Sequence, residues 1–392
     1  MIKRSSTLIL ILAASLILSA GIPEIPLLKI FHKASSSDPT RNILLSPWGI
    51  QECFGMISCG SGKESTAELS HYLGLTPETA LEIYNARKSL QKSKAVFNSC
   101  NAGFLNSQYQ ANQSFVNQVS KLYGGGIFYA DYSDIDACAR SMNKIIKQKS
   151  RSMFDNVFTK QMLADKPVIL LLNVLYFNGI WDENFDKNAT EKETFFIPSP
   201  EKRKIIVDMM NDTRLIPYCN DGTVHGIFLD YRDKRFKMLA LTTVDRNKPL
   251  STVTELLADK GLFYILQKSS QLNKTVIKLP KLKLSGEIDL KSLLNSMGMT
   301  KIFDSGKKDL TGIVKGEPIF LSGARQLVKL ELDEEKTEVA AVTYAAALSC
   351  APDPIPPKYN YFYADRPFVL VLFDSETGAI LLTAAVVDPS GY

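Results

Sequence analysis

Residues that commonly perform catalysis are few in this chain. The 392 residues include only three histidines, His32, His71 and His225. A cysteine acts as a catalytic nucleophile when a base activates its thiol, but Cys350 lies in a proline-rich stretch that contains no histidine. The residues therefore argue against an enzyme, and neither a metal nor a cofactor is expected.

The other five cysteines are spread through the chain. They are Cys53, Cys59, Cys100, Cys138 and Cys219. The cysteine content is too low for a disulfide scaffold, and no CxxC pair suggests a zinc site. Most of the thiols are expected to be small buried hydrophobic groups.

Two other patterns could indicate a ligand, and both have a simpler explanation. The motif GSGKESTAEL at 60–69 begins with GxG, but it lacks the Lys-Ser/Thr pair of a phosphate-binding loop. A turn that opens a helix is the better interpretation. Short basic clusters at 202–204 and 232–237 in a chain of net charge +5 are typical of solvated surfaces, so no nucleic-acid partner is expected.

The first 20 residues are predicted to be a secretory signal peptide. Lys3 and Arg4 precede an apolar run at 8–18, and small residues follow it at 19–21. The run is short for a membrane span, so stable membrane insertion is not expected, although a retained anchor is the alternative. Residues 21–392 are expected to form a secreted, single-domain protein.

Hydrophobic periodicity predicts strands and helices in mixed order. Strands are predicted at 168–177, 237–244, 276–279, 368–373 and 379–387, and helices at 135–149 and 290–297. The first helix is expected to begin with a capping box of Ser133 and Asp136. Asn173 falls within an apolar strand and must find hydrogen-bond partners there. No steady βαβ alternation is present, which indicates one α+β domain.

The stretch that begins at 328 has the period of a strand and continues with small side chains. Val328, Leu330 and Leu332 alternate with charged residues, and the alternation continues through an alanine-rich segment at 337–347. Alone, that segment favours a helix or an unstructured loop. Small residues at alternate positions also suit a strand that enters between two others, until the prolines at 352–357 end the pairing.

Six motifs in order resemble the serpin family from about residue 31 to residue 389. They are NILLSPWGI at 42–50, LNVLYFNGIWDENFD at 172–186, VDMM at 207–210, LPKLKL at 279–284, ELDEEKTEVAAVT at 331–343 and FYADRPFVLVL at 362–372. The resemblance implies an α+β serpin fold with three β-sheets, eight or nine helices and an exposed reactive-centre loop at about 334–357.

The resemblance also implies an inhibitory mechanism. In such proteins a target protease cuts the loop and forms an acyl-enzyme, and the cut loop inserts into a sheet as a new strand. Insertion distorts the protease before the acyl bond is hydrolysed. The loop hinge that corresponds to the family pattern comprises Glu334, Glu335, Lys336, Thr337, Glu338, Val339, Ala340, Ala341 and Thr343.

Five further residues match the region where the sheet opens, and four positions depart from the family pattern. The opening residues are Ser46, Gly49, Asn173, Trp181 and Gln326. Ser46 could instead simply cap a helix, and Trp181 could simply fill core. Lys336 replaces a flexible glycine, Val339 an alanine, Gly49 a serine and Gln326 a histidine. These four departures predict slow insertion, which favours cleavage of the loop without trapping.

The reactive bond is predicted by counting along the loop. The family spacing from Glu334 gives Cys350–Ala351, with Leu348 and Ser349 as alternatives, whereas counting back from FYADRPF gives a position near Asp353. The candidates are small or neutral, apart from the acidic Asp353. The expected partner is a secreted serine protease of elastase-like or subtilisin-like specificity, bound by a monomeric inhibitor.

Two other functions remain open. The hinge departures favour a non-inhibitory serpin that acts as a carrier, chaperone or storage protein, and inhibition of a cysteine protease is a further alternative. Four N-x-Ser/Thr sequons begin at Asn112, Asn188, Asn211 and Asn273. Their use depends on whether the host glycosylates secreted proteins.

Overall fold

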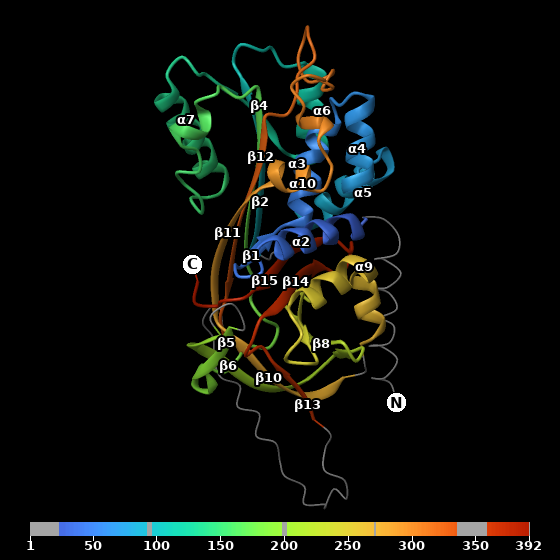
Figure 1. Ribbon diagram of the computed structural model, residues 1–392, viewed down its shortest axis with the longest axis vertical. Coiled ribbons are helices and arrows are strands. Elements are labelled where there is room, and N and C mark those ends of the chain that lie inside the picture. Colours follow the sequence, from blue (N-terminus) through green and yellow to red (C-terminus); the bar gives the residue numbers. More distant parts are fainter. Residues whose placement is uncertain (1–22, 92–95, 198–201, 270–271, 335–358, 392) are drawn as a thin grey trace, which may run out of the picture.

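The computed structural model describes residues 23–91, 96–197, 202–269, 272–334 and 359–391. Within these ranges the chain forms nine α-helices and three β-sheets. The predicted α+β class, the three sheets and the number of helices are thereby confirmed. In Figure 1 most helices gather at one end of the elongated molecule, and the four-stranded sheet lies at the other.

The helices are α2 (Ile25–Ser37), α3 (Pro47–Ser58), α4 (Lys63–Leu73), α5 (Pro77–Leu90), α6 (Gln113–Tyr123), α7 (Ile135–Lys149), α8 (Lys160–Leu163), α9 (Ser251–Gln267) and α10 (Leu290–Ser296). Gly62 precedes α4 as its N-terminal cap. The GxG motif is therefore a turn that opens a helix, as predicted.

The longest sheet has five strands in the order β11-β12-β4-β2-β3. These strands are β2 (Val96–Asn106), β3 (Gly126–Ala130), β4 (Ile169–Asn178), β11 (Leu282–Asp289) and β12 (Gly323–Leu332). One face packs against α7 and the other against α3. Because both faces are covered, β4 is apolar along nearly its whole length.

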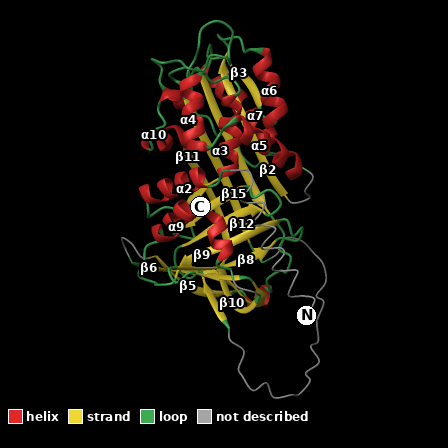
Figure 2. Ribbon diagram, turned by 90° about the vertical axis from the view of Figure 1, so that its right-hand side faces the viewer, coloured by secondary structure: helices red, strands yellow, loops and turns green. Residues whose placement is uncertain are grey.

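The six-stranded sheet lies between the end where most helices gather and the four-stranded sheet at the other end (Figure 2). The six-stranded sheet contains β1 (Ile43–Leu45), β15 (Ile380–Val386), β14 (Phe368–Asp374), β9 (Phe236–Thr243), β8 (Val224–Asp230) and β7 (Tyr218–Asn220), in that order. The four-stranded sheet has the order β13 (Asn360–Tyr363), β10 (Asn273–Pro280), β6 (Arg203–Ile216), β5 (Glu191–Ile197). Every residue of β14 and β15 is buried.

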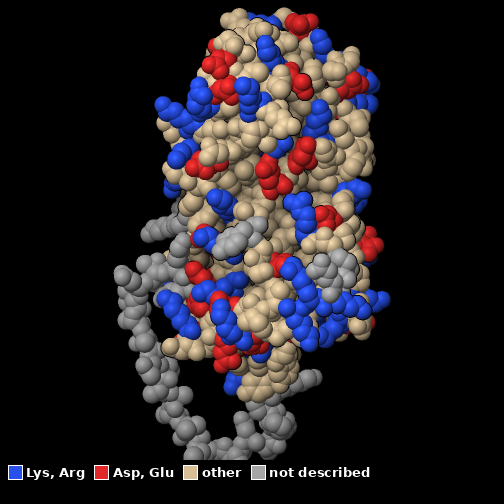
Figure 3. Space-filling model, turned by 60° about the vertical axis from the view of Figure 1, so that its left-hand side comes forward, with Lys and Arg blue, Asp and Glu red and all other residues tan. Residues whose placement is uncertain are grey.

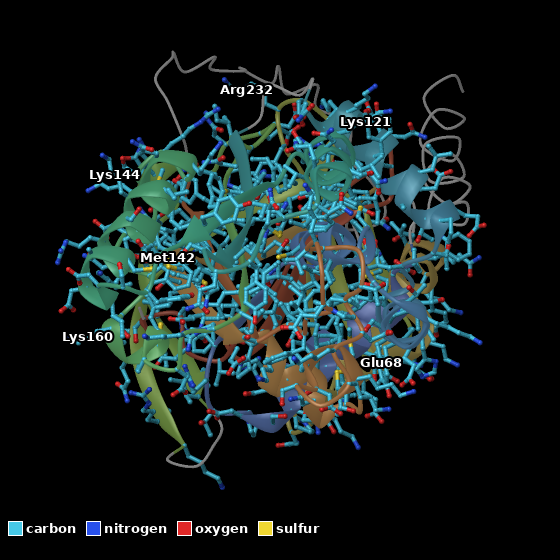
Figure 4. All side chains as sticks on the ribbon, turned by 90° about the horizontal axis from the view of Figure 1, so that it is seen from above. Glu68, Lys121, Met142, Lys144, Lys160 and Arg232 are labelled. Atoms are coloured by element: carbon cyan, nitrogen blue, oxygen red, sulfur yellow. The ribbon has the colours of Figure 1, made fainter. Side chains whose placement is uncertain are left out.

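Helix α7 shows how apolar periodicity positions an element. Met142 and Ile146 are buried against the five-stranded sheet, whereas Lys144 is exposed. Seen from above, Met142 lies inside the molecule and Lys144 at its margin (Figure 4). The predicted capping box was wrong, because Asp134 is the capping residue and its carboxylate accepts the Ala137 N–H.

The basic clusters are not uniformly solvated. Acidic and basic side chains are interspersed over the face shown in Figure 3. Arg235, however, is buried and forms a bidentate pair with the buried Asp374, at 2.8 and 2.6 Å. Pairing of this kind satisfies a guanidinium that would otherwise be costly to bury. No helix in the described residues is long and apolar enough to cross a bilayer.

Candidate functional site: the seam between β4 and β12

The two central strands of the five-stranded sheet are far apart in sequence and pair directly. β4 and β12 run parallel, in register from Leu170 opposite Gly323 to Phe177 opposite Leu330 (Figure 1). We call this line of pairing the seam. After β12 the described chain reaches Glu334, and it resumes at Tyr359 in front of β13. Residues 335–358 therefore leave from one end of the seam.

Two predicted opening residues meet in the middle of the seam. Asn173 of β4 and Gln326 of β12 are register partners, and neither side chain has any exposed surface. Gln326 Nε2 donates to Asn173 Oδ1 at 2.8 Å and to the Ser46 carbonyl oxygen at 2.9 Å. Buried amides of this kind are costly to separate unless new partners replace the old ones. The pair therefore fastens the two strands to each other and to the layer beneath.

Ser46 connects the seam to two other elements. Its side chain caps α3 by accepting the Gly49 N–H, and it donates to the Leu381 carbonyl oxygen of β15 at 2.6 Å. Its own N–H donates to Gln326 Oε1 at 2.8 Å. Ser46 thus caps a helix and also lies under the seam, and its role in sheet opening stays a prediction.

Gly49 contributes by leaving space. A Cβ built on Gly49 would collide with the Asn173 carboxamide, at 2.6 Å from its Cγ. The departure from serine at this position therefore makes room for Asn173. Whether it slows insertion remains a prediction.

We expect Gly49→Ser to destabilise the intact protein by about 1–3 kcal/mol, because Asn173 must move and its hydrogen bonds must lengthen. A thermal melt of the variant beside wild type measures the loss. Gly306→Ser is the matched control, since a Cβ there meets only Asp304 Oδ1, at 3.2 Å. Equal melting temperatures for Gly49→Ser and wild type would contradict the tight fit.

Trp181 lies at the end of the seam from which residues 335–358 depart. Its ring stacks on Tyr231, with centroids 4.5 Å apart and planes at 12°. Its indole N–H donates to the Asp333 carbonyl oxygen at 2.8 Å. Trp181 is buried in the core and also holds the backbone just beyond β12.

Glu334, the first residue of the predicted hinge, is buried and fastened on both carboxylate oxygens. Oε2 pairs with Lys281 Nζ at 2.8 Å, and Oε1 accepts from the Thr190 hydroxyl at 2.7 Å. Its carbonyl oxygen accepts the Phe185 N–H at 3.1 Å. Burial opposes ionisation, but the hydrogen bonds from Lys281 and Thr190 outweigh it, so the pKa of Glu334 lies below its ordinary value.

Removal of Lys281 should loosen this attachment. Lys281→Met leaves the Glu334 carboxylate buried without its cation, and we expect a loss of about 1–2 kcal/mol of unfolding free energy, moderated because Lys281 is partly exposed. Because the pKa of Glu334 is lowered by folding, the pair stabilises the protein above the ordinary value of 4.5 and loses its effect as pH falls below it. Denaturant melts at neutral and acidic pH measure both effects.

Glu334→Gln is the companion variant, because the amide keeps an acceptor for Thr190 but needs no cation. In that background Lys281→Met should cost much less. An equal cost in both backgrounds would show that Lys281 stabilises the protein through other contacts.

The remaining predicted residues of the loop lie outside the described part of the chain. They are the hinge residues Glu335, Lys336, Thr337, Glu338, Val339, Ala340, Ala341 and Thr343, and the reactive-bond candidates Leu348, Ser349, Cys350 and Ala351. Their roles remain predictions.

Several residues of the site were not identified from the sequence. Asn101 of β2 lies opposite Asn173, and its Oδ1 accepts from Asn173 Nδ2 at 2.8 Å. Lys281 stands in the LPKLKL motif, which gave no sign of a partner, and Thr190 appeared only as the third residue of the sequon that begins at Asn188. Of these contacts, only the need of Asn173 for buried partners could be seen in the sequence.

Known proteins resemble this chain over almost its whole length. The family model described as Serpin (serine protease inhibitor) matches residues 27–389. Glia-derived nexin from Mus musculus is 25% identical over 376 residues, which cover 92% of this chain and 91% of that protein. Alpha-1-antitrypsin from Meriones unguiculatus is 27% identical over 371 residues, covering 92% and 88%.

Solved structures agree in fold. The crystal structure of native protease nexin-1 with heparin superposes with a TM-score of 0.81 at 22% identity, and covers 97% of this chain and 100% of that chain. Serine protease inhibitor (serpin)-12 of Manduca sexta gives a TM-score of 0.80 at 19% identity, with coverage of 94% and 99%. The fold agrees with these structures, and the family model matches residues 27–389. This chain therefore belongs to the serpin family of serine protease inhibitors.

Proposed function

We propose that this protein is a secreted, monomeric suicide inhibitor of a serine protease. The observation that supports this most is the seam itself. Two parallel strands pair directly, and a segment of small alternating residues leaves from the end of one of them. A segment that turned back from Glu334 would run antiparallel to both β12 and β4.

Such an insertion replaces one set of hydrogen bonds between strands with two. The parallel pairing of β4 with β12 would be lost, and the new strand would pair antiparallel on both of its edges. Antiparallel pairing is slightly more stable per residue than parallel pairing. The exchange also adds backbone hydrogen bonds, each of which contributes about 0.5–1.5 kcal/mol net. Insertion is therefore favourable once cleavage frees the segment.

The proposed reaction with the protease is an interrupted acyl transfer. The protease serine oxygen attacks the carbonyl carbon of Cys350, the bond to the Ala351 nitrogen breaks, and that nitrogen takes up a proton. Insertion then moves the tethered protease away from the hinge before water reaches the ester. The inhibitor itself contributes no catalytic group in this scheme.

The proposed specificity follows from the loop residues. Leu348, Ser349 and Cys350 are small or neutral, and no lysine or arginine lies between Lys336 and Lys358. A protease with a shallow, uncharged primary pocket, of the elastase or subtilisin type, fits these side chains. Trypsin-like proteases need a basic residue that the loop lacks.

Incubation with an elastase-like protease tests the proposal. We expect a protease–inhibitor adduct that survives SDS, together with a small C-terminal fragment whose mass identifies the bond that was cut. Quantitative cleavage without an adduct would instead favour the non-inhibitory function. An adduct formed only with a papain-like enzyme would favour inhibition of cysteine proteases.

Lys336 allows a separate test of the hinge. We expect Lys336→Gly to lower the number of inhibitor molecules consumed per protease inactivated toward one, because glycine bends more freely as the loop folds in. Titration of protease activity with inhibitor gives this number directly. A looser hinge should also increase spontaneous loss of activity on storage.

Lys336→Arg is the control, since it keeps a long cationic side chain and should leave the consumption number unchanged. If wild type already consumes one molecule per protease, Lys336 does not slow insertion, and the expectation of a slow hinge is wrong.

A further inference from the structure

The polar contacts at the seam continue beyond it to a buried carboxylate. Asn101, Asn173 and Gln326 stand in one row across β2, β4 and β12, because each is the register partner of the next. Asn101 Nδ2 donates to Glu52 Oε2 of α3 at 2.9 Å. The Ser99 hydroxyl donates to the same oxygen at 3.3 Å. The side chains of Gln326, Asn173, Asn101 and Glu52 thus form a continuous line of hydrogen bonds from the seam to the buried face of α3.

This chain of hydrogen bonds has one direction. Gln326 Oε1 accepts a backbone N–H, and the three amide groups then donate in turn, from Gln326 to Asn173, from Asn173 to Asn101, and from Asn101 to Glu52. A backbone N–H can only donate, and an ionised carboxylate can only accept. The two ends therefore fix the orientation of every amide between them.

Glu52 is held at the far end by Arg87 of α5. Arg87 Nε lies 3.5 Å from Glu52 Oε1, and its side chain is partly exposed while that of Glu52 is buried. Space for the guanidinium is provided by Gly124, where a Cβ would collide with it. Gly124 has a φ of +57°, a conformation that also favours glycine.

Among the described residues, Arg87 is the one permanently charged group that affects the ionisation of Glu52. The other titratable neighbours are Cys53 of α3, Cys100 of β2 and Tyr123 of α6. Burial raises the pKa of Cys100 to about 11 and that of Tyr123 to about 12, and it raises the pKa of Cys53 further. These three groups are neutral between pH 6 and pH 8. Burial raises the pKa of Glu52 to about 7, although Asn101 and Arg87 act in the opposite direction.

We propose that Glu52 is a positioning residue for loop insertion, whose ionised carboxylate orients the Asn101–Asn173–Gln326 row and so keeps β4 and β12 paired until the loop enters. This inference rests on the proposed inhibitory function. Glu52 is buried, and its side-chain partners among the described residues include Asn101, Ser99 and Arg87. It acts through the three amides, and Arg87 keeps its charge in place.

The direction in which pH affects sheet opening depends on whether the closed or the open sheet favours ionised Glu52. When β12 separates from β4, Gln326 no longer polarises the row, and the hydrogen bond that Asn101 gives to Glu52 weakens. The helices α3, α5 and α6 still cover the carboxylate, so the pKa of Glu52 is higher in the open sheet than in the closed one. The closed sheet therefore loses support as pH falls through about 7.

Uptake of an added peptide measures opening without any protease. We would use a synthetic peptide with the sequence of residues 337–347, blocked at both ends, and follow its entry as a rise in melting temperature and a shift on a native gel. We expect wild type to take up the peptide about threefold faster at pH 6 than at pH 8, the size of change that a modest shift in one coupled pKa produces.

Glu52→Gln is the critical variant. The amide keeps an acceptor for Asn101 but carries no charge, so uptake should be as fast at pH 8 as in wild type at pH 6, and it should not vary between these values. Glu24→Gln is the matched control. Burial also raises the pKa of Glu24 to about 7, but its partners are backbone N–H groups at 262–263 in α9. This control should keep the wild-type pH response.

Substitution of Arg87 tests whether Glu52 acts through its charge. A purely structural role of Arg87 would leave the midpoint of the pH response unchanged. Loss of its positive charge in Arg87→Gln should raise the pKa of Glu52 and shift the midpoint of the pH response upward. Arg87→Lys keeps the charge and should largely restore the midpoint. Intact folding of each variant is checked by its far-UV circular dichroism.

The outcomes distinguish the role of Glu52 from the insertion mechanism itself. Wild type that takes up no peptide at any pH would count against the proposed insertion mechanism itself. Uptake that is equal at pH 6 and pH 8, or a pH response that persists in Glu52→Gln, would overturn the role of Glu52 and leave the insertion mechanism standing.

Discussion

Thr337→Arg is expected to abolish inhibition while the loop is still cut. In the proposed mechanism Thr337 enters the seam first, with its side chain toward the core. A buried, unpaired guanidinium costs several kcal/mol, which would stall insertion and let water hydrolyse the acyl-enzyme. On SDS gels the wild-type protein should give a covalent adduct, and the variant should give only the cleaved product.

Ile355→Arg is the control for this experiment. It introduces the same side chain beyond the proposed reactive bond, where no residue has to enter the sheet, so adduct formation should persist. The intact Thr337→Arg protein should melt like wild type. Adduct formation by Thr337→Arg at the wild-type rate would show that this segment does not insert as proposed.

Cleavage near Cys350 is expected to raise the melting temperature by tens of degrees. The intact protein pairs β4 with β12 through one parallel ladder, whereas the cut protein would hold a new strand with ladders on both edges. Each added backbone hydrogen bond contributes about 0.5–1.5 kcal/mol net, and the small side chains add packing without strain. Scanning calorimetry of intact and cut protein measures the difference.

Two further samples make this measurement specific. Cut Thr337→Arg should melt close to the intact protein, because its loop cannot enter. Cut Lys336→Gly should melt as high as cut wild type, because the hinge affects the rate of insertion and not its end state. A cut wild-type protein that melts no higher than the intact one would favour the non-inhibitory function.

The elements with strong periodicity could be predicted from the sequence alone. β4 was expected at 168–177 and is observed as Ile169–Asn178, and the hairpin of β14 and β15 was expected within a residue or two. A strand that is buried on both faces has a continuous apolar run, which can be recognised in the sequence without knowing which strands lie beside it. The cap of α7 was misplaced by one residue, because Ser133 and Asp134 are both capable of capping and only the backbone geometry selects Asp134.

The candidate site could be predicted only in part. The need of Asn173 for partners was visible, and the resemblance placed Gln326 in the same opening region. Asn101 and Gln326 lie 72 and 153 residues away, however, and the hydrogen bonds that they share with Asn173 depend on strand register. The buried pair of Glu334 with Lys281 has the same origin. In the sequence, Gly49 is only a serine replaced by a residue without a side chain. The packing shows that the Asn173 carboxamide occupies the space that a side chain at this position would need. Contacts between distant segments leave little trace in a single sequence.

The bond between Ser46 and β15 has a consequence for the order in which the chain folds. The Ser46 hydroxyl donates to the Leu381 carbonyl oxygen, and β15 follows residues 335–358 in sequence. The segment that must stay out of the sheet is therefore translated before the strand that completes the support beneath the seam. Until the C-terminal hairpin docks, β4, β12 and the loop can fold together without the buried strands that support them. Slower docking of this hairpin should increase the share of chains that fold with the loop already inserted, and these molecules would be inactive although their sequence is unchanged.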